Sequence, residues 1–206
     1  MAYLFGAARP GSENRWPRAL LIHRALRGRG EAPGRLLLRR NPDQQIAPAL
    51  RWLRDNLGIR RWFVVGDDYI WPRTSLTEVR RYARDLSLDL VGGSFMALGD
   101  GDTKRLVDKV ARSGCEAVLM LLVGQDAVEF NGAFARRRLA DSILRFSPLM
   151  DENMLIGRGA GATKGLFAAA SYFRCMVGRN AMDLLDRYLA VNGTNAPALG
   201  NAAESC

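Results

Sequence analysis

The sequence predicts an α/β fold built on a doubly wound parallel sheet, and three observations lead to that prediction. From residue 47 to residue 191, segments with a helical spacing of apolar residues alternate with short apolar runs. The short runs are apolar at consecutive positions, which is typical of parallel strands covered on both faces. Most of them end in Gly, Asp or Gln residues, which favour the turn from a strand into a loop.

The best-defined strand is Phe63-Val64-Val65, which ends at Gly66-Asp67-Asp68. Ser75 and Glu78 then have the spacing of a capping box, so we expect a helix over residues 75–87. The residues between strand and helix form a polar and aromatic loop. This strand, loop and helix would together make one unit of the doubly wound sheet.

The preceding helix carries Leu50, Leu53 and Leu57 on one face and ends at Gly58. We place Pro48 in its first turn, because proline is poorly tolerated in a helix interior. The other expected elements are a strand over 88–98, a helix from an Asp102 N-cap to Gly114, strands over 117–123, 143–146 and 166–173, and helices over 126–139 and 181–191, the last with Met182, Leu185 and Leu189 inward.

Three strand ends carry polar residues that could contact a ligand. The first includes Asp68, Tyr69 and Trp71, the second includes Gln125, and the third is the loop over 147–153 with Met150 and Asp151. The carboxyl ends of parallel strands are where open α/β sheets bind small molecules. The alternative is that these are ordinary turns and that Tyr69 and Trp71 cover the core.

The net charge of +9 is concentrated near the N-terminus. Residues 1–40 hold nine Arg against Glu13 and Glu31, whereas the remaining residues hold 21 basic and 19 acidic groups. Arg15 to Arg29 has the spacing of a short basic helix. We divide the chain into an atypical basic segment over 1–40, expected to be poorly ordered, and a domain over 41–206. Nucleic-acid binding by the Arg-rich segment is the alternative function, which the nearly neutral body disfavours.

No catalytic or metal site is predicted. The three Cys residues have no CxxC spacing, and the one His lies in the basic segment, so the body has no imidazole to activate a nucleophile. The Gly-rich stretch over 157–165 fails the P-loop pattern, because Gly165 follows Lys164 where Ser or Thr is needed. We therefore expect a protein that is not an enzyme and needs no cofactor.

The run Arg61 to Arg73, which contains Gly66-Asp67-Asp68-Tyr69 and Pro72-Arg73, resembles the type I periplasmic-binding-protein family. Within that family it is most similar to the branch of the amide sensor of amidase operons and of the urea and short-chain amide receptors of ABC transporters. Val123 to Asp126 and Gly165 to Phe173 match later strand ends of the branch in order and spacing. The resemblance covers residues 41–206.

The resemblance implies a two-lobe fold with a small ligand between the lobes, of which this chain holds mainly the second lobe. We therefore expect a truncated member of the family. Tyr69 matches the tyrosine that contacts the ligand in this branch. The implied partners are a small neutral amide or amino-acid-like ligand and either an ABC permease or a regulatory protein.

No segment has the length and apolarity of a membrane span, and no signal peptide is evident at the N-terminus. We therefore expect a cytoplasmic chain without membrane insertion, although full-length relatives are implied to be periplasmic or in the cell envelope.

Overall fold

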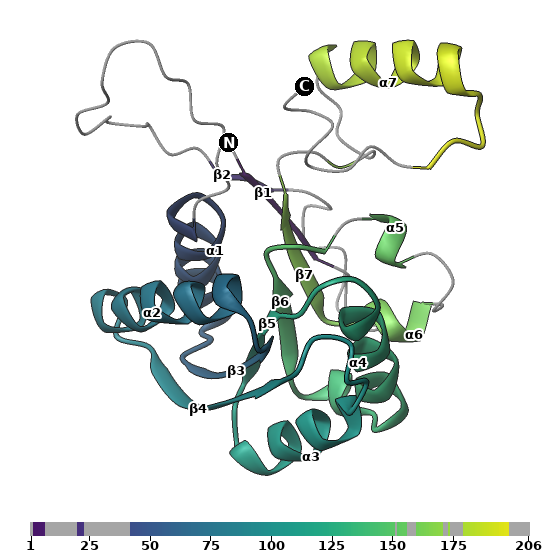
Figure 1. Ribbon diagram of the computed structural model, residues 1–206. Helices are drawn as coiled ribbons and strands as arrows, with labels where there is room; N and C mark the ends of the chain where they lie inside the picture. Colours follow the sequence, from purple (N-terminus) through teal and green to yellow (C-terminus); the bar gives the residue numbers. More distant parts are fainter. Residues whose placement is uncertain are drawn as a thin grey trace.

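The computed structural model describes residues 2–6, 20–22, 42–150, 152–155, 160–170, 173 and 179–197. Over these residues the strands form one sheet with the order β2-β1-β7-β6-β5-β3-β4 (Figure 1). Five of them run parallel, and these are β3 (Arg61–Asp67), β4 (Asp89–Met96), β5 (Ala117–Leu121), β6 (Leu144–Ser147) and β7 (Leu166–Ala170). The predicted fold class is confirmed.

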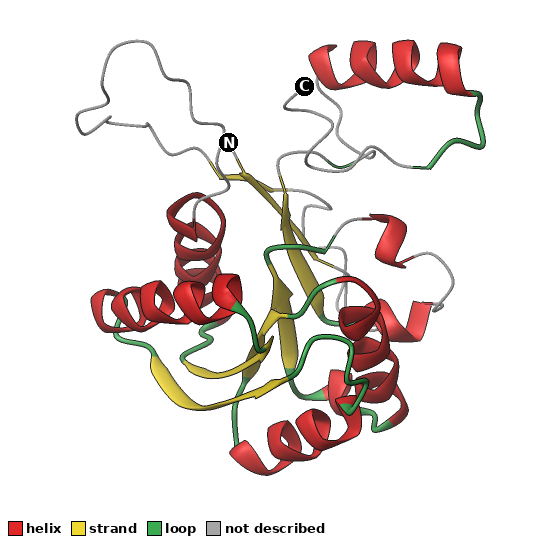
Figure 2. Ribbon diagram, viewed as in Figure 1, coloured by secondary structure: helices red, strands yellow, loops and turns green. Residues whose placement is uncertain are grey.

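Helices cover both faces of the parallel strands, as the two-sided apolar pattern requires (Figure 2). The helices α1 (Pro42–Leu57) and α2 (Ile70–Asp85) cover one face, and α3 (Thr103–Ser113) and α4 (Gly124–Arg136) cover the other. Shorter elements complete the chain, namely the 3-10 turn η1 (Leu139–Asp141), α5 (Glu152–Leu155), α6 (Ala160–Thr163) and the C-terminal α7 (Arg179–Asn192).

The two faces of β3 and β5 contribute to different cores. Phe63 and Val65 of β3 pack with α3 and α4, whereas Trp62 and Val64 pack with α1 and α2. Every residue of β5 is buried. This alternation explains why the sequence shows unbroken apolar runs rather than a polar face.

Two predicted helix starts are wrong. The helix α2 begins at Ile70 rather than at residue 75, and Ser75 lies buried inside it, so the capping box does not form. Pro72 occupies the first turn, where its missing N–H costs nothing. Likewise α1 begins at Pro42, which leaves Pro48 inside the helix on a partly exposed face.

The helix α3 has the ends that its sequence predicts. The Asp102 carboxylate accepts a hydrogen bond from the Arg105 N–H (3.3 Å), and Gly114 follows the last turn in the left-handed conformation with φ of 66°. An N-cap side chain and a left-handed glycine satisfy backbone groups at the two helix ends.

Arg145, in the middle of β6, is fully buried beneath α4 and α6. Its guanidinium donates to the carbonyls of Ala162 (3.0 Å) and Lys164 (2.6 Å) and to Oδ1 of Asn131, and it lies over the ring of Phe134. Its Nε has no hydrogen-bond partner. Burial lowers the pKa of Arg145 to about 10. The cation thus binds backbone dipoles at the end of α6.

The described parts of the N-terminal segment are two strands. The strand β1 (Ala2–Gly6) runs antiparallel to β7, and β2 (Leu20–Ile22) runs antiparallel to β1, so the basic helix expected over 15–29 is wrong at Leu20–Ile22. The rest of residues 1–41, and with it most of the Arg-rich segment, lies outside the described residues. The division of the chain at residue 40 therefore stays a prediction.

The C-terminal helix α7 covers the predicted range, but one side chain of its inward face is misassigned. Met182 is 54% exposed, whereas Leu185 and Leu189 are partly buried. Over the described ranges, no helix combines the length and the apolar character that crossing a membrane requires.

Candidate functional site

The candidate site is the carboxyl edge of β3 and β5, where residues 67–69 and 123–126 meet. The two strands are paired in parallel, with Gly66 opposite Leu121. The Val123 N–H donates to Oδ2 of Asp67 (2.8 Å), and the Gly99 N–H donates to Oδ2 of Asp126 (2.7 Å). These bonds join the end of β3, the start of α4 and the 97–102 turn. The N-termini of α2 and α4 begin at this same edge.

Asp67 and Asp126 are the buried charges of this edge, with 0% and 4% of their surface exposed. The pKa of Asp67 is raised to about 6, chiefly by burial and also by the nearby Asp126, while the hydrogen bond from Val123 opposes the shift. Neither residue was among the predicted ligand contacts. No local signal in the sequence marks these two Asp residues as the buried ones.

Asp68 lies on the exposed side of the edge. Its carboxylate accepts a hydrogen bond from Nε of Arg73 (2.7 Å), and this bond lowers the pKa of Asp68. The Arg73 guanidinium also lies over the ring of Phe95, 4.3 Å from its centroid. A ligand that used Asp68 would compete with Arg73 for this carboxylate.

Tyr69 is the N-cap residue of α2 and is partly buried. Burial raises the pKa of its phenol, and the charge of Asp67 adds to that effect, so the phenol is neutral and can donate or accept. Trp71 is also partly buried, and it packs against the core between the sheet and the helices α1 and α2. Tyr69 and Trp71 thus stand in the first turn of α2 rather than in a loop.

The contacts predicted at the other strand ends differ in exposure. Gln125 is exposed in the first turn of α4, where its Nε2 donates to Oε1 of Glu129 (2.9 Å). Met150 is only 1% exposed, and its sulfur lies 3.5 Å from Nδ2 of Asn131. Asp151 lies outside the described residues. The structure therefore places Tyr69 and Gln125 at adjoining strand ends and buries Met150 beneath the surface.

Cys115 is poorly placed for nucleophilic chemistry. It is buried, and burial raises the pKa of its thiol. A raised pKa leaves little of the reactive thiolate near neutral pH. Within the described ranges, no three His, Cys, Asp or Glu side chains gather closely enough to hold a metal ion.

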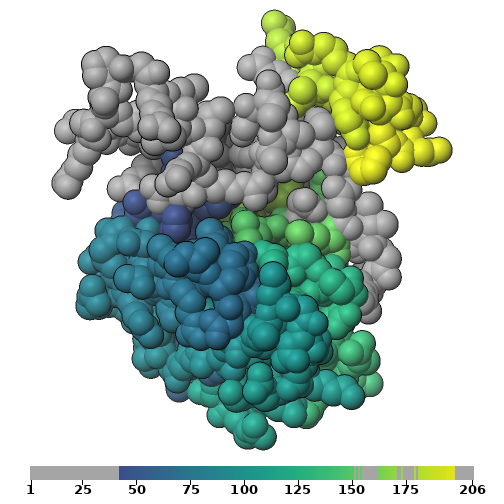
Figure 3. Space-filling model, in the orientation of Figure 1, coloured from purple at the N-terminus to yellow at the C-terminus, as the bar shows by residue number. Residues whose placement is uncertain are grey.

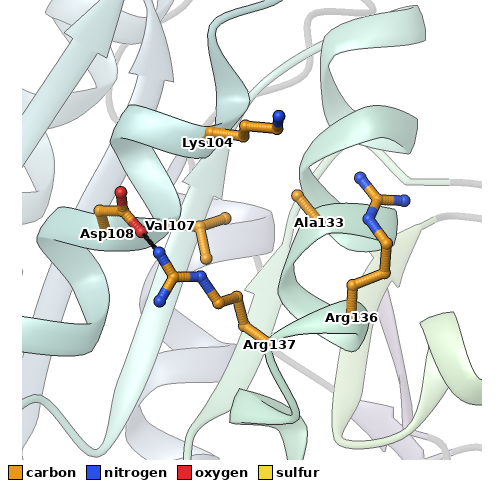
Figure 4. A pocket seen from close by; sticks show the side chains of 6 residues that line it. All are labelled: Lys104, Val107, Asp108, Ala133, Arg136 and Arg137. Carbon is orange, nitrogen blue, oxygen red and sulfur yellow. Dashed lines mark hydrogen bonds and ion pairs between the residues drawn. The ribbon is translucent and has the colours of Figure 1, made fainter.

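A separate hollow of about 310 Å³ lies between α3 and α4 (Figure 4). Val107 and Ala133 form part of its wall, Lys104 and Arg136 reach over it from the two helices, and Arg137 pairs with Asp108. All six lining residues come from α3, α4 and the residue after α4. In Figure 3 the blue part of the chain adjoins the teal and green parts in one continuous body.

Comparisons with solved structures agree with this fold. An ABC transporter substrate-binding protein from Sphaerobacter thermophilus has a TM-score of 0.68 at 18% identity, over 78% of this chain and 44% of its own. An amino acid ABC transporter substrate-binding protein from Pseudomonas fluorescens Pf-5 has a TM-score of 0.64 at 12% identity, over 71% and 40%. A solute-binding protein from R. palustris, in complex with benzoate, has a TM-score of 0.63 at 16% identity, over 74% and 41%.

These identities show a shared fold, and the chain spans less than half the length of each of the three structures. No curated protein matches the sequence. A model of the periplasmic binding protein family matches residues 23–205, which is most of the chain. The match does not distinguish the amide-sensor branch. On this evidence the chain belongs to the periplasmic binding protein family.

Proposed function

We propose that this chain provides one side of a binding site for a small amide, urea or amino-acid-like ligand in a substrate-binding protein. The observation that carries the proposal is the meeting of residues 67–69 and 123–126 at the carboxyl edge, joined by the bond from Val123 to Asp67. Of the predicted contacts, Tyr69 and Gln125 supply a phenol and an amide at this edge, and Asp68 supplies a carboxylate. Trp71, Met150 and Asp151 are the remaining proposed contacts, with Met150 acting from beneath the surface.

The charge of the edge favours a neutral or ammonium-bearing ligand over an anion. Asp67, Asp68 and Asp126 lie within the two segments. Arg73, the cation that binds to one of these residues, is already paired with Asp68. A carboxylate ligand would face this negative charge, whereas an amide N–H or an ammonium group could donate to it. We therefore place amides, urea and amino acids ahead of aromatic acids such as benzoate.

The affinity of the chain by itself should be weak. For acetamide or urea, four heavy atoms at about −1.5 kcal/mol each set a ceiling near −6 kcal/mol, or tens of micromolar. One edge can satisfy only about half of the ligand's polar groups, which leaves about −3 kcal/mol and a dissociation constant of several millimolar.

Nuclear magnetic resonance (NMR) of the ¹⁵N-labelled chain can detect binding of this strength. We expect 50 mM (about ten times the dissociation constant) acetamide or urea to shift the amide signals of residues 67–69 and 123–126. Benzoate at the same concentration should shift them less. Tyr69→Phe should weaken the effect, while Lys104→Gln, which alters the hollow between α3 and α4, should not. Shifts confined to other regions, or larger shifts with benzoate, would contradict the proposal.

The transport role is the proposed setting for this site, with an ABC permease as the partner. The alternative setting is regulation of an amidase operon, which the resemblance of Arg61 to Arg73 to the amide-sensor branch suggests. The two settings differ in compartment. Cell fractionation should find the protein in the periplasm for transport and in the cytoplasm for regulation.

A further inference from the structure

Two buried carboxyl groups lie behind the proposed contacts at the carboxyl edge. Asp67 is the last residue of β3, two positions before Tyr69, and Asp126 lies in the first turn of α4, directly after Gln125. With 0% and 4% exposure, neither carboxyl can be solvated by bulk water. Their conformation therefore depends on their hydrogen-bond partners.

Each carboxyl group has one backbone donor from a different segment. Oδ2 of Asp67 accepts from the Val123 N–H, just before α4, and Oδ2 of Asp126 accepts from the Gly99 N–H, in the turn after β4. The Asp68 N–H, for its part, donates to the Met96 carbonyl at the end of β4 (2.6 Å). The two carboxyls thus join the segments that carry Tyr69 and Gln125 to each other and to the turn after β4.

The remaining oxygen of Asp67 requires an explanation. Oδ1 is buried and has no hydrogen-bond partner. The Asp126 side chain interacts with that of Asp67 and raises the pKa of Asp67. Two carboxylates cannot hydrogen-bond without a proton, but a carboxylic acid and a carboxylate can, and that bond would satisfy Oδ1.

We propose that Asp67 and Asp126 share one proton, and that this protonated pair positions Tyr69 and Gln125 for the ligand. This inference rests on the proposed function for the role of Tyr69 and Gln125, but the shared proton itself does not. Burial and the charge of Asp126 both raise the pKa of Asp67, to about 6, which agrees with a proton held by the pair.

Among the described residues, no cation forms an ion pair with Asp67 or Asp126. Asp68, on the same strand end, is paired with Arg73, and Tyr69 carries a neutral phenol. The other charged groups on the adjoining segments are Asp100 and Asp102 in the 97–102 turn, Glu129 on α4, and Lys104 and Arg105 on α3, of which Arg105 pairs with Asp102. Loss of the proton would therefore leave two buried like charges near each other, which would destabilise this edge.

The test is a pH titration of the full chain, without ligand, by NMR. The carboxyl carbon of Asp67 should show a step with a midpoint near pH 6, and the amide protons of Val123 and Gly99 should follow it. The backbone amide of Tyr69 and the side-chain amide of Gln125 should shift with the same midpoint. Asp67→Asn should abolish that step, because an Asn amide donates permanently to Asp126. The exposed neighbour variant Asp68→Asn should retain it.

The outcomes separate the parts of the inference. If the Asp67 carboxyl ionises below pH 5 (well under the expected midpoint of about 6), or if Asp68→Asn abolishes the step, the shared proton is wrong. If the pair titrates but the signals of Tyr69 and Gln125 do not follow, positioning is wrong. If all of these signals follow and acetamide shifts no signal at pH 5.5 or pH 8 (on either side of about 6), the proposed function fails while the shared proton stands.

Discussion

Arg145 is a buried cation bound by dipoles rather than by a carboxylate in its described contacts, and its replacement by methionine should destabilise the fold. Methionine retains most of the side-chain volume, so the change chiefly removes charge and donors. Three buried acceptors then lose their donor, namely the Ala162 and Lys164 carbonyls and Oδ1 of Asn131. The effect therefore reports on the bonds that hold α6 and α4 to β6.

Two opposing terms set the magnitude. Leaving three buried acceptors unpaired costs about 1–3 kcal/mol each, or about 3–9 kcal/mol in total. The variant no longer buries a charge, and a pKa lowered from 12.5 to about 10 corresponds to about 3 kcal/mol of recovered penalty. The difference centres near 3 kcal/mol of lost stability, which is about 1–1.5 M in the urea midpoint for a chain of this size.

Urea unfolding followed by tryptophan fluorescence measures this change, since Trp62 is buried in the core. Arg145→Lys keeps a charge but loses the forked geometry, so its midpoint should fall between those of the wild type and Arg145→Met. Arg80→Met, on the exposed face of α2, is the control and should change stability by less than about 0.5 kcal/mol. An Arg145→Met midpoint equal to that of Arg80→Met would refute the reasoning.

Three further predictions concern stability. A Cβ at Gly66 would lie 2.6 Å from the Phe95 ring, so Gly66→Ala should lower the stability in urea unfolding by about 1–2 kcal/mol. Adding Phe95→Leu should restore part of that stability. If the stability changes of the two substitutions simply add in the double variant, this explanation is contradicted. Asp102→Ala removes the N-cap of α3 and should cost about 1 kcal/mol, whereas an equally stable variant would show the cap to be dispensable. The folded chain holds the Asp67 proton more tightly than the unfolded chain, so the stability from Asp67 is present below pH 3.8 and lost as the pH rises through about 6. At pH 8 the variant Asp67→Asn should therefore be more stable than the wild type by up to about 3 kcal/mol, whereas near pH 4 the two should be almost equally stable. If the urea midpoints of variant and wild type differ by the same amount at both pH values, this linkage is excluded.

The five parallel strands and their order of occurrence were predictable because burial on both faces leaves a direct mark in the sequence. Ala117 to Val123 reads as a buried strand, and its first five residues form the fully buried β5. The ends of α3 were predictable for a similar reason, since Asp102 and Gly114 act through local backbone geometry. Local signals compete, however, and at α2 the first-turn Pro72 outweighed the capping-box spacing of Ser75 and Glu78.

The sequence predicted which residues follow the strand ends but not which of them are buried. Strand ends at Asp68, Tyr69 and Gln125 were identified, because polar residues after a buried strand mark the carboxyl edge. The buried partners were not, since nothing local distinguishes Asp67 from Asp68. The Asp67 side chain binds the Val123 N–H inside the protein, whereas the Asp68 side chain pairs with Arg73 at the surface. The neighbouring strand, and not the local sequence, decides which of the two is buried.

The sequence by itself determined the α/β class and the family, because apolar periodicity and turn residues act over a few positions. The tertiary structure alone decided which charges are buried. Charged side chains are expected to be exposed to solvent, yet the fold buries those of Asp67, Asp126 and Arg145. The physical reason is that burial depends on elements distant in the chain, and the packing of α4 and α6 over β5 and β6 brings those elements together.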